Sequence, residues 1–194
     1  MVRRRLKNMD GTALMRRTMV AGAVLLLLCP RSFAQGADFS GFNDVATVAA
    51  HGKTDDLIRI LQGGRPPDVP DDKGETALHY AAQLGDQRMV QALLYYKASV
   101  DPRDQFGNTP LHWAAQRGDL AILQMLIDAK AAIDPQNRQG VTPLMMAAQA
   151  GQAQAVRLLL KDGADPHHAD FTGRDAAGWA NGKPAIVQIL RAAK

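Results

Sequence analysis

The chain has 194 residues, of which 46% are hydrophobic, and its 23 basic and 19 acidic side chains give a formal net charge of +4. The basic excess is confined to residues 1–34, so residues 35–194 hold 16 basic and 18 acidic side chains. Nucleic-acid binding requires a dense basic face, and this mildly acidic remainder does not support it. Its length is that of one domain.

Residues 1–34 have the pattern of an export signal. A basic head precedes the apolar run 19–28, and the small residues Ser32 and Ala34 predict cleavage before Gln35. An apolar run of about ten residues is too short to cross a bilayer core, which needs about 20. We therefore expect export, with no stable membrane insertion after cleavage.

The export route stays open on the sequence. Arg16 and Arg17 loosely resemble a twin-arginine motif, whereas the leucine-rich run favours the general secretory route. Cys29 is the one cysteine of the chain and lies inside the predicted signal. After cleavage the chain could form no disulfide, so packing alone would hold it together.

Beyond the signal, a glycine returns every 33 residues, at Gly74, Gly107, Gly140 and Gly173. Similar residues surround the first three of these glycines. A fixed period of this length predicts stacked repeats, in which each unit buries its apolar face against its neighbours. Such stacks build long binding surfaces.

The sequence of each repeat predicts a turn followed by two short helices. Gly107 permits a tight turn, and Thr109 is placed to cap the helix that follows. Gly118 would end that helix, and Asp119 would cap a second one over 120–129. The second helix has apolar residues at helical spacing, which predicts one buried face.

The string Thr-Pro-Leu-His-Trp-Ala-Ala over 109–115, with close copies over 76–82 and 142–148, resembles the ankyrin repeat family. The resemblance implies an all-α repeat solenoid over residues 35–194, with helix-turn-helix units joined by β-turn or hairpin loops. The expected units are three full repeats at about 71–103, 104–136 and 137–169, between degenerate capping repeats at about 38–70 and 170–194.

A column of large side chains follows the same period, with Tyr80, Trp113, Met146 and Trp179 each 33 residues apart. This register places the column between successive helices, so we interpret it as packing rather than as a ligand site.

Two lysines depart from the repeat pattern. Lys97 and Lys130 stand where Gly163 ends the second helix of a later repeat. We expect both lysines to adopt a left-handed backbone conformation, which is unfavourable by about 1 kcal/mol for a non-glycine residue.

The histidines do not point to catalysis. For His79 and His112 the resemblance implies a hydrogen bond that ties each turn to the next repeat. His167 and His168, followed by Asp170, could ligate a metal ion, but adjacent histidines diverge and lie here in a polar loop.

Other catalytic groups are scarce after residue 34. Ser40 and Ser99 are the serines of that region, which has no cysteine, and neither serine has the sequence context of a nucleophile. We expect no enzyme activity, no cofactor and no metal.

The resemblance also implies that another protein binds at the turn tips and along the concave face of the first helices. Among these positions, phenylalanine and arginine are the residue types favoured as interface anchors. The candidate partner-binding residues are Lys73, Glu75, Arg103, Gln105, Phe106, Asn108, Gln116, Arg117, Arg138, Gln139, Phe171 and Arg174. Tyr95 and Tyr96 could form a second patch.

We therefore predict a monomeric, non-catalytic protein-protein interaction module, exported to the periplasm, with a periplasmic protein as its partner. An alternative is a secreted effector or toxin-neutralising protein that acts on a foreign target. The third hypothesis, a metal-binding or enzymatic protein, rests on the His167–His168 pair alone.

Overall fold

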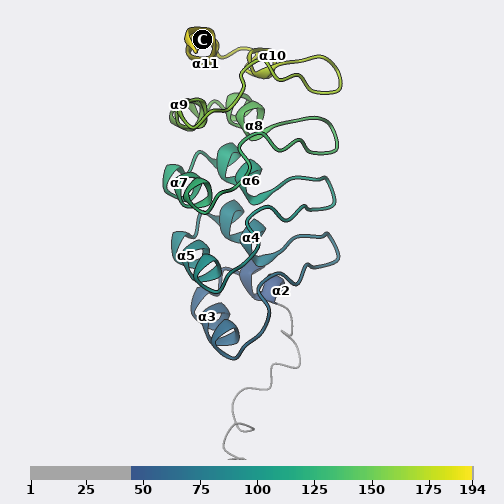
Figure 1. Cartoon of the computed structure of the whole chain (residues 1–194), viewed down its shortest axis with the longest axis vertical. Coiled ribbons are helices and arrows are strands. Elements are labelled where there is room, and N and C mark those ends of the chain that lie inside the picture. Colours follow the sequence, from purple (N-terminus) through teal and green to yellow (C-terminus); the bar gives the residue numbers. More distant parts are fainter. Residues whose placement is uncertain (1–44, 194) are drawn as a thin grey trace, which may run out of the picture. The chain divides into compact units, whose positions relative to one another are not determined.

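The computed structural model describes residues 45–193, so the predicted signal segment and its cleavage site lie outside the described residues. The described part consists of paired helices (Figure 1). The pairs are α2 (Val45–Ala50) with α3 (Thr54–Gln62), α4 (Ala77–Leu84) with α5 (Gln87–Tyr95), α6 (Pro110–Arg117) with α7 (Leu120–Asp128), α8 (Pro143–Ala150) with α9 (Ala153–Lys161), and α10 (Ala176–Trp179) with α11 (Pro184–Ala192).

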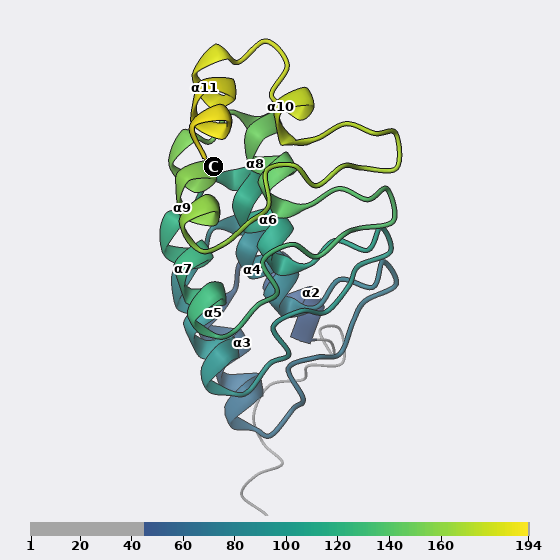
Figure 2. The same ribbon diagram turned by 45° about the horizontal axis from the view of Figure 1, so that its top comes forward.

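The pairs stack into two layers of helices. The first helices contact one another in the order α2, α4, α6, α8, α10, and the second helices in the order α3, α5, α7, α9, α11. The turns between pairs project to one side of this stack (Figures 1 and 2). The predicted all-α architecture of stacked helix pairs is confirmed.

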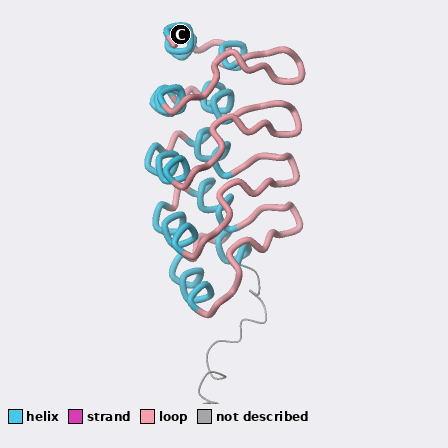
Figure 3. The backbone as a smooth tube through the Cα atoms, in the orientation of Figure 1, coloured by secondary structure: helices cyan, strands magenta, loops and turns pink. Residues whose placement is uncertain are grey.

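Within residues 45–193 the turns contain no strand (Figure 3). Single backbone hydrogen bonds nevertheless join each turn tip to the next. Gln105 N–H donates to the Lys73 carbonyl at 2.8 Å, and Arg138 N–H donates to the Phe106 carbonyl at 2.9 Å. These bonds hold neighbouring turns in register.

Local signals in the sequence explain where the first helices begin and end. At the start of α6, Thr109 N–H donates to Nδ1 of His112 at 3.0 Å, within a capping box. Gly118 ends α6 in the left-handed conformation, with φ of 78°. Asp119 then accepts the N–H groups of Ala121 and Ile122 and caps α7.

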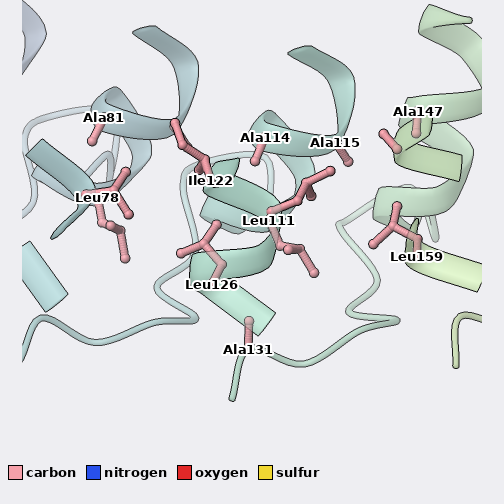
Figure 4. Close-up of a cluster of buried hydrophobic side chains, with 14 of the residues drawn as sticks. Leu78, Ala81, Leu111, Ala114, Ala115, Ile122, Leu126, Ala131, Ala147 and Leu159 are labelled. Atoms are coloured by element: carbon pink, nitrogen blue, oxygen red, sulfur yellow. The ribbon is translucent and has the colours of Figure 1, made fainter. Parts of the chain in front are cut away.

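The core lies between the two helix layers (Figure 4). Leu111 of α6 and Ile122 and Leu126 of α7 are fully buried there. Ala114 and Ala115 are also fully buried, and α6 contacts both α4 and α8. The small alanine side chains allow this close approach of the first helices.

The two unusual lysines adopt the expected left-handed backbone. Lys97 has φ of 62° and Lys130 has φ of 71°, and Gly163 stands at the equivalent position with φ of 97°. The prediction for these residues is confirmed.

The described helices include none with the length and apolar character needed to cross a membrane.

Candidate partner-binding face

In the turns that contain Asp71, Asp104 and Asp170, the aspartate side chain fixes the backbone. The Oδ1 atom of Asp104 accepts the backbone N–H groups of Phe106 and Asn108, each at 2.8 Å. Asp71 and Asp170 make the equivalent bonds in their own turns. Side chains beside these aspartates are therefore presented from a fixed backbone.

The column of large side chains is bonded to the same aspartates. Trp113 donates from its indole nitrogen to Oδ2 of Asp104 at 3.3 Å, and Trp179 does so to Oδ2 of Asp170 at 2.9 Å. Tyr80 makes the equivalent bond to Asp71 at 2.6 Å. The column is half-buried against the core, as predicted, and its Tyr80, Trp113 and Trp179 also link α4, α6 and α10 to their own turns.

The bond between Asp71 and Tyr80 shifts the pKa of both side chains. Burial would raise the pKa of Asp71, but the Tyr80 hydroxyl and the N–H groups of Glu75 and Lys73 outweigh it and lower the pKa. Burial and the bond to Asp71 raise the pKa of Tyr80. Tyr80 therefore stays a hydrogen-bond donor at neutral pH.

The third full repeat departs from this pairing at both positions. Asn137 replaces the aspartate and Met146 replaces the aromatic residue. The Asn137 side-chain oxygen accepts the Gln139 and Val141 N–H groups at 2.9 and 3.0 Å. Its amide nitrogen donates to Oδ1 of Asn108 at 2.8 Å, so the turn keeps its shape without the charge.

A groove of about 620 Å³ lies at this repeat. One part of its lining comes from two consecutive turns: Gln105, Phe106, Asn108, Asn137, Arg138, Gln139 and Val141. The remainder comes from the first helices, with Met146 and Gln149 of α8 and Trp179 of α10. We call the surface formed by the turn tips and the exposed side of the first helices the turn-side face.

The groove brings together five of the twelve candidate residues: Gln105, Phe106, Asn108, Arg138 and Gln139. Phe106 is 58% exposed although it is apolar. Phe171, at the tip of a later turn, is 71% exposed and does not line the groove. Gln116 and Arg117 line a separate hollow of about 330 Å³ with Gln83 and Trp113.

Two candidates need correction, because Glu75 and Asn108 are buried, with exposed fractions of 9% and 5%. Glu75 accepts a hydrogen bond from the Gln83 side chain. The Asn108 carbonyl accepts from Nε2 of His79 at 3.1 Å. Both residues serve the turns and present little surface to a partner, even where Asn108 reaches the groove lining.

The candidate arginines differ in how their charge is compensated. Arg174 forms an ion pair with Asp170 at 3.1 Å and lies 4.5 Å from the centre of the Trp179 ring. Arg103 instead donates to the neutral carbonyls of Gly107 and Gln136, at 3.1 and 2.6 Å. Lys73 and Arg138 are exposed at turn tips.

Sequence reasoning missed several groove residues. Asn137, Met146 and Trp179 were not expected at the face, although they line the groove. Val141, beside the turn glycine, and Gln149, after the Ala-Ala pair, lie at positions that the repeat pattern assigns to the face. The signal that could have found them is the simultaneous loss of aspartate and aromatic residue in one repeat. Where a repeat has lost both the aspartate and the aromatic residue that bonds to it, its surface differs from that of the neighbouring repeats.

The histidines of the motif are structural. Nδ1 of His112 accepts the Thr109 N–H, so Nε2 carries the proton and donates to the Val141 carbonyl of the next repeat at 3.0 Å. Burial lowers the pKa of His112 to about 4 and also lowers that of His79. The expected tie between repeats is confirmed.

The part of the chain that the structure describes holds no group of three or more His, Cys, Asp or Glu side chains placed to bind a metal ion. The His168 ring contacts the Gln136 side chain, and the His167 N–H donates to Asp165.

Stacked helix pairs with an open face of rigid turns define a solenoid repeat protein. A family model described as ankyrin repeats (3 copies) matches residues 45–138, 97–170 and 118–194. The chain therefore belongs to the ankyrin repeat family. Ankyrin repeats are typically protein-protein interaction modules and usually non-catalytic, and no enzyme family was found. No curated protein sequence matched the chain.

Proposed function

We propose that this chain is a monomeric, non-catalytic interaction module that is exported to the periplasm and binds another protein through its turn-side face. The observation that carries the proposal is the open groove beside Phe106. An apolar side chain on a rigid turn, next to a groove of this size, is what a partner-binding surface requires.

The geometry of the face supports binding with little rearrangement. Asp104 holds the Phe106 backbone, and the bond from Arg138 N–H to the Phe106 carbonyl joins this turn to the next. A preorganised surface loses less conformational entropy when a partner binds. The turn-side face is therefore suited to recognition without folding on binding.

Site-specific photocrosslinking in the native host tests the binding face. A photoreactive phenylalanine derivative replaces Phe106 in the full chain, and in a matched variant it replaces Gln91, an exposed residue of α5 in the second-helix layer. We expect a discrete adduct with one other protein at position 106 and none at position 91. No adduct at position 106, or the same adduct at both positions, would contradict the proposed face.

The export half of the proposal is supported by the basic head and apolar run of residues 1–34. Cell fractionation with N-terminal sequencing tests it: we expect periplasmic protein that begins at Gln35. Leu26→Arg, which places a charge in the apolar run, should leave uncleaved protein inside the cell. Uncleaved wild-type chain in the cytoplasm would show that this half is wrong.

A further inference from the structure

We propose that the groove at the third full repeat binds an extended acidic segment of the partner, with one large apolar side chain inserted against Met146 and Trp179. This inference rests on the proposed function and assigns the chemistry of what is bound. It is carried by three features of the groove: a missing aromatic side chain, a set of free amides and an unbalanced positive charge.

The apolar anchor follows from the missing aromatic side chain. In other repeats Tyr80, Trp113 and Trp179 occupy this position and bond to the aspartate of their turn. Met146 is narrower than these rings and has no hydrogen-bond donor. The flexible thioether of methionine adapts to an inserted side chain and contacts aromatic rings favourably. The space beside it is bounded by apolar groups from Phe106, Val141 and Trp179.

The extended form of the segment follows from the amides along the groove. Gln105, Gln139 and Gln149 are exposed and line it from the turns and from α8. Each primary amide offers donors and an acceptor, which suit the free N–H and carbonyl groups of an extended backbone. The groove has a volume of about 620 Å³, which exceeds what one inserted side chain needs. This volume is typical of ligand sites, which measure about 300–1,000 Å³.

The acidic character follows from the charges at the groove. Arg138 is the charged residue of the lining, and no acidic residue lines it. Arg103 adds a second cation bonded to the adjoining turns, with carbonyl groups rather than carboxylates as its partners. Asp104 keeps its negative charge while it accepts four N–H groups, and Asp170 pairs with Arg174. Arg103, Arg138 and Arg174 therefore exceed these two carboxylates by one positive charge. Carboxylate groups on the partner would complement this excess.

Trp179 gives a local readout for binding. The chain has two tryptophans, and Trp113 does not line this groove. In the full chain with Trp113→Phe, the probe is the peptide acetyl-Asp-Glu-Asp-Glu-Phe-Glu-Asp-Glu-Asp-amide, titrated while Trp179 emission is recorded. Two matched peptides carry lysine at every acidic position, or alanine in place of phenylalanine.

We expect the acidic phenylalanine peptide to change Trp179 emission and to bind at least about tenfold more tightly than either matched peptide. Its affinity should fall as salt rises from about 50 mM to about 200 mM. Equal affinity for the acidic and lysine peptides, or for the phenylalanine and alanine peptides, would overturn the proposal. So would emission that changes with protein concentration alone, since the occupant would then be a second copy of the chain.

Two sets of variants distinguish a loss of binding at the groove from a loss of folding. Asn137→Asp with Met146→Tyr rebuilds the Asp71–Tyr80 pair in the third repeat and should abolish peptide binding while the melting temperature is kept. Arg138→Glu should weaken binding about tenfold, whereas Arg157→Glu, an exposed position on α9, should not. Undiminished binding by the rebuilt repeat would show that the groove is not the site.

The same double variant distinguishes this inference from the proposed function. If the photocrosslink at Phe106 survives Asn137→Asp with Met146→Tyr, the turn-side face binds its partner but the groove does not accept the segment. If wild type gives no crosslink at Phe106, the proposed function itself fails. Loss of the crosslink in the double variant supports both.

Discussion

Two lysines hold backbone conformations that suit glycine. Lys97 and Lys130 each follow the end of a second helix with positive φ, at 62° and 71°. A Cβ atom in the left-handed region is crowded by the neighbouring backbone, which is unfavourable by about 1 kcal/mol or more. At the equivalent position, Gly163 has nothing within 4 Å of where a Cβ would stand.

Lys97→Gly should therefore raise the free energy of unfolding by about 0.5–1 kcal/mol, as should Lys130→Gly. Urea unfolding followed by circular dichroism measures this change. Lys97→Ala provides the control, because alanine keeps the Cβ atom and should bring no gain. A lower stability for both glycine variants would show that the left-handed conformation is not strained here.

Burial of His112 makes stability depend on pH. Its folded-state pKa is about 4, against about 6.5 in an unfolded chain, so the unfolded state takes up a proton first as the pH falls. The contribution of neutral His112 is complete above the unfolded pKa and is lost as the pH falls toward the folded one. His79 acts in the same direction.

From about pH 7 to about pH 5, His112 should account for a loss of about 2 kcal/mol in the free energy of unfolding. His112→Met copies the residue found at position 145 of the next repeat and should reduce the pH dependence by that amount. Burial raises the pKa of Asp134, which acts in the opposite direction and is common to both proteins. Unfolding curves with the same pH dependence for both would contradict the assignment.

At the scale of elements, each turn depends on one side chain to hold its backbone. Asp104 accepts from Phe106 N–H, from Asn108 N–H and from the Trp113 indole. In the next turn, the side-chain oxygen of Asn137 accepts the two equivalent backbone N–H groups. The acceptor atom rather than the charge thus shapes the turn.

Asp104→Ala should lower the free energy of unfolding by about 2–3 kcal/mol, because it leaves buried N–H donors without acceptors. Asp104→Asn should lower it by less, because the amide oxygen can still accept both backbone N–H groups. Thermal unfolding of the two variants measures the difference. Equal losses would mean that the charge of Asp104, and not its acceptor geometry, stabilises the turn.

At the scale of the whole repeat domain, stability depends on the position of a repeat in the stack. Interior helices contact neighbours on two sides, whereas α11 contacts α9 and the short α10. In a stack held by contacts between neighbours, an end repeat can open while the interior remains folded.

Leu190→Ala in α11 should therefore speed hydrogen exchange in α10 and α11 while amides of α6 keep their protection. Leu111→Ala in α6 should instead destabilise the stack as a whole, by about 2–5 kcal/mol. Both leucines are buried, so the contrast isolates their place in the stack. Equal effects on α6 would show that the described repeats unfold as one cooperative unit.

The architecture and most of its local detail could be predicted from the sequence. The 33-residue period, the capping threonines and the ending glycines are local signals, because each depends on the φ, ψ or hydrogen bonds of a few adjacent residues. The left-handed Lys97 and Lys130 follow from the same local register, by comparison with Gly163.

The 33-residue register did not predict which of the residues beside the turns are buried. Glu75, Asn108, Val141 and Arg174 are equivalent positions, yet the first three are buried and Arg174 is exposed. The first three are each followed by another full turn, whereas Arg174 belongs to the final repeat of the described stack. Whether such a side chain meets solvent depends on the next repeat and not on its own sequence neighbours.

The sequence alone therefore determined the repeat fold and the helix boundaries, since these depend on local patterns. The tertiary structure decided where a partner could bind. Phe106, Met146 and Trp179 meet at one groove although they lie far apart along the chain, because stacking places a turn, α8 and α10 side by side. That meeting depends on contacts between repeats, which the residues of any one repeat do not encode.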